Sequence, residues 1–332
     1  MQTKQIISEF KNEPFIDFSL PENGSAMHAA IEKVRGELGR EYHCVIGGEK
    51  ISLESRFKSF NPARKDEVIG VFPETDDDTS LVTKAIDAAT EAFKTWRNVP
   101  AAERATYLFR IAEIMRQRKH ELSAWMVFEV AKTWPEADGD TAEAIDFAEF
   151  YAREALRWAE EQPLTRIPTE RNSLEYIPLG VGAIIPPWNF PLAIMSGMTM
   201  AAIVSGNTVV LKPSSDAPTI AAKFMEIVEE AGVPAGVVNF LTGSAATGEG
   251  MVTSPKTRFI SFTGSKAVGL HINEEAAKTR PGQIWIKRVI AELGGKDAII
   301  VCDDADLDAA AVGVVQSAFG FQGQKCSACS RL

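Results

Sequence analysis

The sequence predicts an α/β protein built on a doubly wound parallel sheet with helices on both faces. Three observations support this fold class. From about Leu179 onward, short apolar runs typical of strands recur along the chain ("GVGAII", "TVVLKP", "VVNFLTG", "RFISFTG"). Helical segments such as "APTIAAKFMEIVEEAG" lie between them, which gives the β-α-β-α alternation of a parallel sheet. The length of 332 residues is sufficient for two domains or one large α/β unit.

The composition is that of a soluble globular protein, with 45% apolar and 24% charged residues. The 35 basic and 45 acidic residues give a net charge of −10, which does not favour binding to nucleic acid or to an anionic membrane. The N-terminus, "MQTKQIISEFKNEPF", lacks the apolar segment of a secretory signal. The most apolar stretch, "LAIMSGMTMAAIVSG", is too short to span a bilayer. We therefore expect a cytoplasmic protein, or a mitochondrial matrix protein if the source is eukaryotic.

The first half of the chain precedes the β-α alternation. Residues 1–44 form an N-terminal segment with an amphipathic helix near "AMHAAIEKVRGEL", and "YHCVIGGEKI" predicts a hairpin that turns at Gly47 and Gly48. "SFNPARKDEVIGVFPETD" is expected to be an extended, turn-rich connection. Helical periodicity then predicts three helices between about residues 79 and 160. "LTRIPTERNSLEYIPLG" alternates like a pair of strands and predicts an edge hairpin.

The cysteines indicate one reactive thiol. Four cysteines are too few and too scattered for a disulfide framework, and no histidine lies near the C-x-x-C pair of Cys326 and Cys329 to complete a zinc site. A thioredoxin-type dithiol would be expected early in the chain rather than at its end. Gly323 and Gln324 suggest a turn, so we expect Cys326 at the start of a following helix, where the helix dipole would favour the thiolate.

Two loops that follow predicted strands contain candidate binding groups. "IIPPWNFP" presents Asn189, whose side-chain N–H could stabilise negative charge on a reacting oxygen, although Asn is also a common turn residue. "VVLKPSSDAP" places Lys212 at a strand end, where it could bind a ribose or a phosphate or be a solvated surface charge.

Two further loops complete the candidate site. In "SFTGSKAVG", Gly264 and Ser265 lie between a strand and a helix, where backbone N–H groups and the helix dipole could bind a diphosphate. This segment lacks both G-x-G-x-x-G and the ending of a nucleoside-triphosphate P-loop, which disfavours a kinase or an ATPase. "IAELGGKD" places Glu292 at a strand end as a candidate general base, followed by two glycines that permit close backbone approach. Together these residues suit thiol-mediated chemistry on a carbonyl.

Five motifs occur in one order: "PPWNFP", "GNTVVLKPS", "FTGS…G", "ELGGK" and "GQ-x-C". In this combination the chain resembles the aldehyde dehydrogenase superfamily from about residue 45 to its end. The segments "ERNSLEYIPLGVGAIIPPWNFPLAI", "AIDFAEFYAREA" and "GQKCSACSR" most resemble the branch that oxidises L-glutamate γ-semialdehyde to L-glutamate in proline and arginine breakdown.

This resemblance implies a role for each motif residue. Cys326 would attack the aldehyde to form a thiohemiacetal, with Asn189 and the Cys326 backbone N–H holding the oxyanion. Hydride transfer to NAD would leave a thioester, and Glu292 would activate the water that hydrolyses it. Three residues could contact the substrate, namely Phe190, Ser327 and Glu143, the last of which is equally well explained as a solvated helical charge. Cofactor contacts are implied for Pro187, Trp188, Lys212, Ser215, Gly243, Gly248, Phe262, Gly264 and Ser265. No metal is implied, and Cys329 is interpreted as a small packed residue.

The resemblance also implies a domain plan. A Rossmann-like NAD-binding domain would comprise residues 45–160 and 180–291, and a catalytic α/β domain would begin with 292–332. Residues 161–179 would form a β-extension that reaches another subunit of a homo-oligomer. Because family members continue well beyond this length, we expect the chain to be a fragment of a longer enzyme and to be inactive alone.

Ser215 bears on the choice of cofactor. Many NAD-dependent relatives have a glutamate at this position, three residues after the lysine, where it binds the adenosine 2′-hydroxyl and repels a 2′-phosphate. With Ser215, NAD is expected to be used best and NADP to be accepted. Three alternatives remain: an aldehyde dehydrogenase for another substrate class, a non-catalytic nucleotide-binding fragment, and a thiol hydrolase that uses Cys326 and Glu292 without cofactor.

Overall fold

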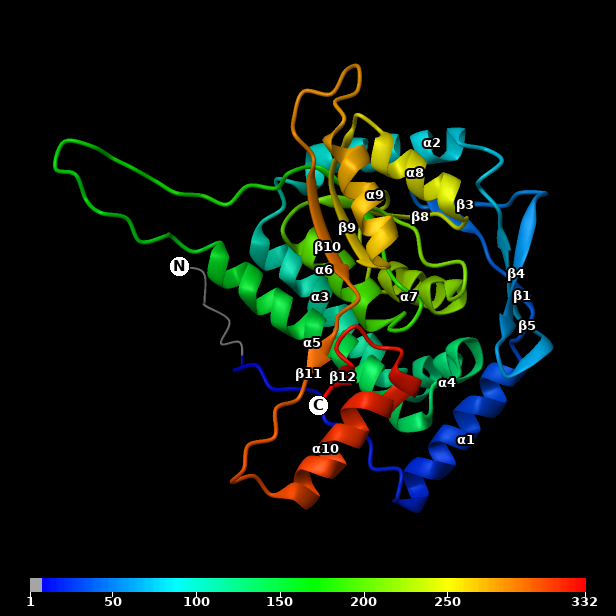
Figure 1. The fold of residues 1–332 in the computed structure, drawn as a ribbon. Helices are drawn as coiled ribbons and strands as arrows, with labels where there is room; N and C mark the ends of the chain where they lie inside the picture. Colours follow the sequence, from blue (N-terminus) through cyan, green and yellow to red (C-terminus); the bar gives the residue numbers. More distant parts are fainter. Residues whose placement is uncertain (1–7) are drawn as a thin grey trace.

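A seven-stranded sheet forms the centre of the computed structural model, which describes residues 8–332 (Figure 1). The strand order is β10-β9-β6-β7-β8-β2-β3. All pairs from β10 to β8 are parallel, and β2 and β3 join the far edge as antiparallel strands. The predicted α/β class with a largely parallel sheet is therefore confirmed. The strands are β2 (Cys44–Ile46), β3 (Glu49–Ile51), β6 (Val181–Ile185), β7 (Thr208–Leu211), β8 (Val238–Phe240), β9 (Thr257–Gly264) and β10 (Arg288–Leu293).

Helices cover both faces of this sheet (Figure 1). Ile184 and Leu211 point into one core, shared with α3 to α7, whereas the neighbouring Ala183 and Val210 point into a second core, shared with α2, α8 and α9. Such strands are apolar on both faces, which explains their continuous hydrophobic runs. The helices are α2 (Ser80–Trp96), α3 (Ala101–Gln117), α4 (Lys119–Val130), α5 (Trp134–Trp158), α6 (Ala193–Val204), α7 (Pro218–Glu230), α8 (Ala245–Thr253) and α9 (Lys266–Ala277).

The strand order creates a switch point beside β6. The chain proceeds outward through β7 and β8 and then returns so that β9 pairs with the opposite side of β6. The connections after β6 and β9 therefore diverge and leave a crevice at the carboxyl ends of these strands. This crevice is where the sequence places its candidate loops.

The N-terminal region contains one confirmed hairpin and one that was not expected. β2 and β3 turn at Gly47 and Gly48, whose φ angles of 61° and 85° suit a two-residue hairpin turn. The connection expected from "SFNPARKDEVIGVFPETD" is instead a hairpin of β4 (Arg56–Asn61) and β5 (Arg64–Pro73). Pro62 lies in its turn, where a missing N–H removes no ladder bond. β1 (Arg40–Glu41) adds a parallel strand to β5, and α1 (Pro21–Arg35) precedes it as predicted.

The segment expected to form a hairpin at 161–179 contains no strand in the structure. It extends far from the body of the fold after α5, as the green excursion in Figure 1 shows, and nearly all of it is exposed. Pro163, Pro168 and Pro178 each remove a backbone donor, and within residues 8–332 the two arms have no strand partner. The segment leaves the body of the fold, but its two arms are not paired as strands, so the predicted hairpin does not form within residues 8–332.

The C-terminal elements follow β10 and form no part of the seven-stranded sheet. They are β11 (Asp297–Ala298), α10 (Leu307–Phe319), the short 3₁₀-helix η1 (Gly320–Gly323) and β12 (Cys329–Arg331), which pairs in parallel with β11. None of the residues of α10 is buried. Across residues 8–332, every helix is too short or too polar to cross a membrane.

Candidate active site

A groove of about 1050 Å³ runs across the switch point. Its walls come from the ends of β6, β7 and β9, from the first turns of α8 and α9, and from the loop that contains Cys326. Most of the residues predicted to bind a cofactor line it, namely Pro187, Trp188, Lys212, Ser215, Gly248, Phe262, Gly264 and Ser265, together with Asn189 and Cys326. Motifs that are up to about 140 residues apart in the sequence therefore face one space.

The loops of Asn189 and Cys326 are in direct contact. Asn189 Nδ2 donates a hydrogen bond to the carbonyl oxygen of Gln324 at 2.8 Å, two residues before the thiol. This bond uses one of the two amide N–H donors of Asn189 and leaves the second available. Cys326 itself is exposed to the groove.

Glycine brings the loop of Glu292 against the loop of Cys326. A Cβ at Gly295 would lie only 2.6 Å from the carbonyl oxygen of Cys326, so no larger residue fits without displacement. The predicted close approach at "GG" is therefore confirmed for Gly295, whereas Gly294 has no atom near its missing side chain.

The prediction that Cys326 begins a helix is wrong. Phe321 and Gln322 adopt left-handed φ angles of 49° and 53° in η1, and Cys326 lies in the turn that leads into β12. Phe321 N–H donates to Glu136 Oε1 at 2.6 Å, a tertiary contact that redirects the backbone. The thiol consequently has no helix dipole behind it in this structure.

A second cavity, of about 490 Å³, opens on the other side of Cys326. Glu292 and Cys326 both line it, and so both lie beside one space that could admit a small substrate. Gly197 in α6 leaves room for the ring of Phe147, since a Cβ there would approach that ring to 2.8 Å. The remaining wall is mainly apolar and includes Tyr151, Ile194, Met198, Phe262 and Ile290.

The start of α5 supports the loops of Asn189 and Cys326, which the sequence did not reveal. Buried Asp140 accepts a hydrogen bond from Lys132 Nζ at 2.8 Å and another from Ala193 N at 2.7 Å. Lys132 Nζ in turn lies 3.9 Å from the ring centre of Phe190, a cation–π contact. Glu136 both closes the capping box of α5 and holds Phe321. The capping box "T-x-x-E" was visible in the sequence, but its second partner was not.

Lys212 is buried beneath the groove. Its Nζ donates to the carbonyl oxygens of Pro213 and Gly243, both at 2.9 Å. The Lys212 stem passes beside Gly248, where a Cβ would lie 3.5 Å from Lys212 Cε, an ordinary contact distance. Burial lowers the pKa of Lys212 to about 8, although Asp76, Glu74 and Asp216 act in the opposite direction. The alternative of a solvated surface charge is therefore excluded.

Ser265 is the N-cap of α9, as the strand-loop-helix pattern predicts. Its side-chain oxygen accepts a hydrogen bond from Val268 N at 3.3 Å. The N–H groups of the first turn of α9 face the groove together with Lys266, a cation that sequence analysis did not single out. This arrangement could bind an anionic group.

The candidate substrate residues line neither cavity. Phe190 packs against Phe321 with ring centres 6.3 Å apart, and Ser327 is exposed in the turn after Cys326. Glu143 is exposed on α5. The surrounding protein still raises the pKa of its carboxyl group by partial desolvation, and the charge of Asp140 adds to this effect. Cys329 is half-buried.

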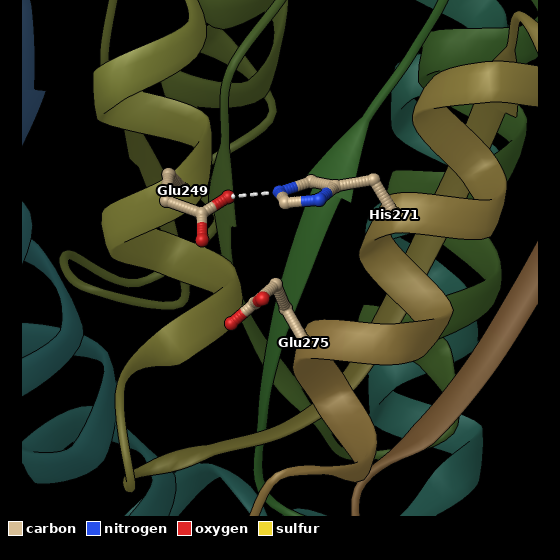
Figure 2. Close-up of side chains that lie close together, drawn as sticks. All are labelled: Glu249, His271 and Glu275. Carbon is tan, nitrogen blue, oxygen red and sulfur yellow. Dashed lines mark hydrogen bonds and ion pairs between the residues drawn. The ribbon is translucent and has the colours of Figure 1, made fainter.

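A charged cluster lies between α8 and α9 (Figure 2), and two of its members, Glu249 and His271, line the groove. His271 on α9 pairs with Glu249 on α8 at 2.8 Å, and this hydrogen bond raises the pKa of His271. Together with Glu275 they offer three potential metal ligand atoms within 4.8 Å of one another. Glu275, however, already accepts from Lys278 at 2.5 Å and from Arg280 at 2.6 Å. A metal ion would have to displace two cations, so we interpret the cluster as an ion-pair network.

Known proteins share both the sequence and the fold. Residues 50–332 match the Aldehyde dehydrogenase family. The chain is 56% identical over 327 residues to a 1-pyrroline-5-carboxylate dehydrogenase of Geobacillus thermodenitrificans, covering 98% of this chain and 63% of the relative. A Thermus thermophilus 1-pyrroline-5-carboxylate dehydrogenase superposes with a TM-score of 0.96 at 49% identity, over 99% of this chain and 64% of that one.

A further structure of a Thermus 1-pyrroline-5-carboxylate dehydrogenase, with bound NAD, matches with a TM-score of 0.95 at 48% identity, again over 99% of this chain and 64% of that one. The chain thus spans a little under two thirds of the length of the relatives that it matches. The family match covers most of the chain, from within β3 to the residue after β12. The chain therefore belongs to the aldehyde dehydrogenase family.

Proposed function

We propose that the protein oxidises an aldehyde to a carboxylic acid with NAD, and that its substrate is L-glutamate γ-semialdehyde, which it converts to L-glutamate in the cytoplasm. One observation supports this most directly. Cys326 lies between the groove with the cofactor motifs and the apolar cavity that contains Glu292. The relatives named 1-pyrroline-5-carboxylate dehydrogenase, which share more than half of the residues of this chain, support the substrate.

The side chains of the chain divide the chemistry between them. The Cys326 thiolate attacks the aldehyde carbon, and the second N–H of Asn189 with the backbone N–H of Cys326 holds the oxyanion of the thiohemiacetal. When bound, the nicotinamide accepts the hydride that this carbon loses. Glu292 then removes a proton from a water molecule, which adds to the thioester carbonyl, and the carboxylate product leaves as the Cys326 thiolate is restored.

The groove suits an elongated dinucleotide. Its floor contains Lys212 for a ribose, and the N-terminus of α9 with Gly264 and Ser265 lies where a diphosphate would be neutralised. Around these we assign cofactor contacts to Pro187, Trp188, Ser215, Gly243, Gly248 and Phe262. A Thermus relative was solved with bound NAD, which supports this assignment.

We assign the substrate and the assembly as follows. Although these residues line neither cavity of this chain, Phe190 would pack on the aliphatic part of the substrate, Ser327 would bind a carboxylate, and Glu143 would face the amino group. Residues 45–160 and 180–291 would form the Rossmann-like cofactor domain, and 292–332 would begin the catalytic domain. The exposed arm of 161–179 would pair with another copy in a homo-oligomer, because its unpaired backbone groups lack strand partners within residues 8–332.

The test uses the full-length protein with NAD and glutamate γ-semialdehyde, followed by the absorbance of reduced nicotinamide. Formation of reduced cofactor with this substrate, and weaker formation with acetaldehyde, is expected. Absence of reduced cofactor with any aldehyde would refute the dehydrogenase. Ester cleavage without cofactor would instead favour a thiol hydrolase that uses Cys326 and Glu292.

A further inference from the structure

Asp76 belongs to the loop between β5 and α2, outside every motif of the candidate site, yet its carboxylate holds the start of α8. Its Oδ1 accepts hydrogen bonds from Ser244 N at 2.9 Å, Thr247 N at 3.0 Å and Thr247 Oγ1 at 2.5 Å. Its Oδ2 accepts another from Ser244 Oγ. Burial opposes ionisation, but these hydrogen bonds outweigh it and lower the pKa of Asp76. Asp76 is thus a fixed negative charge that caps α8 from another element.

This anchor reaches Lys212 through one residue. Gly243 immediately precedes Ser244, and its carbonyl oxygen accepts a hydrogen bond from Lys212 Nζ. The conformation of Gly243 is tightly constrained: at φ 149°, a Cβ would lie 2.4 Å from Thr247 Oγ1 and 3.0 Å from Asp76 Oδ1. The position of the Gly243 carbonyl oxygen therefore follows from the bonds that Asp76 makes.

The protonation state of Lys212 determines what it can offer a ligand. Its ammonium group has three N–H donors, and two of them bind the carbonyl oxygens of Pro213 and Gly243. Only the charged form has a third donor for a ribose hydroxyl, because a neutral amine has two. Burial lowers the pKa of Lys212 to about 8 even with Asp76, Glu74 and Asp216 acting in the opposite direction, so this third donor is lost as the pH rises through about 8.

Few charges surround this lysine. Asp76 has the largest stabilising influence on the ammonium group, followed by Glu74 from the same loop and Asp216 from the loop after β7. Glu249 on α8, Lys266 and His271 on α9, and Lys325 in the loop of Cys326 line the same groove. Among all of these, only Asp76 also fixes a hydrogen-bond partner of Lys212 through its cap of α8.

We propose that Asp76 is a positioning residue for cofactor binding: it orients Lys212 through Gly243 and keeps its third N–H donor available for a cofactor ribose. The proposal rests on the proposed NAD-dependent aldehyde oxidation and extends it to Asp76, which lies outside the five family motifs. It predicts that loss of the Asp76 charge changes the pH range over which the protein binds NAD, in addition to any change in affinity.

The test measures NAD binding to the full-length protein by isothermal titration calorimetry between pH 6.5 and 9. In the wild-type protein, affinity is expected to fall around pH 8 as Lys212 loses its proton. Asp76→Asn retains an acceptor that can cap α8 but removes the charge. Its midpoint should shift downward by at least about 0.5 pH unit, so that its affinity relative to the wild type falls roughly threefold more at pH 9 than at pH 6.5. Asp76→Glu, which retains the charge, should keep the wild-type midpoint.

Asp77→Asn provides the matched control, since it removes an adjacent carboxylate that bonds Ser55 and has no contact with α8. Its profile should equal that of the wild type. If Asp76→Asn does not fold, Asp76→Ser replaces it with the same expectation. A loss of affinity that is equal at every pH, or no loss at all, would overturn the proposal. A wild-type protein that does not bind NAD at any pH would instead refute the proposed function.

Discussion

Replacing Glu129 by glutamine is expected to remove a pH dependence of stability that this buried carboxyl group imposes on the fold. Glu129 lies on α4 with only 2% of its surface exposed. It accepts hydrogen bonds from Ser59 Oγ at 3.1 Å, Thr219 N at 2.7 Å and Ile220 N at 2.9 Å, and so joins β4 to the first turn of α7. Burial raises the pKa of Glu129 to about 7 from 4.5, although these hydrogen bonds act in the opposite direction.

The sign follows from proton linkage. Between pH 4.5 and pH 7 the folded state binds a proton at Glu129 that the unfolded chain has lost, so the free energy of unfolding decreases as the pH rises through this range. At about 1.4 kcal/mol per pKa unit, the full effect is roughly 3 kcal/mol, of which about 2 to 3 kcal/mol falls between pH 5 and pH 8. Glu129→Gln cannot ionise and should lack this decrease.

Urea unfolding of the full-length protein and of Glu129→Gln at several pH values from 5 to 8 measures the difference. The wild type should lose stability relative to the variant as the pH rises, even though glutamine replaces one accepting oxygen with a donor. Glu91→Gln, an exposed change on α2, serves as control and should leave the slope of the wild type unchanged. If the free energy of unfolding depends on pH in the same way for the wild type and Glu129→Gln, the three donors compensate the cost of burying the charge. The predicted effect of Glu129 would then be refuted.

Three further predictions concern the site. Cys326→Ala should abolish formation of reduced cofactor, whereas Cys329→Ala should retain most of it; comparable losses in the absorbance assay would favour a dithiol mechanism. Phe190→Ala should lower kcat/KM for glutamate γ-semialdehyde more than for acetaldehyde, and equal changes for both would refute the packing role. Ser215→Glu should suppress turnover with NADP by roughly tenfold or more, because a carboxylate repels the 2′-phosphate, while NAD use is retained. Equal loss with both cofactors would show that position 215 does not face the ribose.

Local signals made the sheet and the loops that line the groove predictable. Ser265 follows a strand and precedes a helix, and its capping bond to Val268 spans three residues. Gly47 and Gly48 favour a tight turn through their positive φ angles, and this preference does not depend on where the hairpin packs in the fold. The loops of Asn189 and Lys212 follow two parallel strands, and parallel strands all end on the same side of the sheet. Their proximity could therefore be predicted from the strand pattern alone.

Contacts between distant segments were not predictable in this way. Asp76 and Ser244 are 168 residues apart, and the run "ETDDDT" indicates only an acidic helix start. The same limit explains the error at Cys326. Its predicted helix depended on the local turn signal of Gly323, whereas the backbone direction follows from the bond between Phe321 and Glu136, which are 185 residues apart. The arm at 161–179 shows a second limit of sequence-based prediction. Alternation of apolar and polar residues predicts a strand but does not identify the segment with which it pairs.

The close packing at Gly295 has a consequence for how the site tolerates change. A methyl group there would stand at 2.6 Å from the Cys326 carbonyl oxygen, about 0.8 Å inside ordinary contact distance. Alanine at this position would have to push the loop of Cys326 away from the loop that follows Glu292 by nearly that amount. A displacement of this size can slow an enzyme by about a hundredfold without removing any reacting atom. The distance between the Cys326 thiol and the Glu292 carboxylate therefore depends on residue 295 having no side chain. We expect natural variation at residue 295 to be far narrower than at its neighbour Gly294.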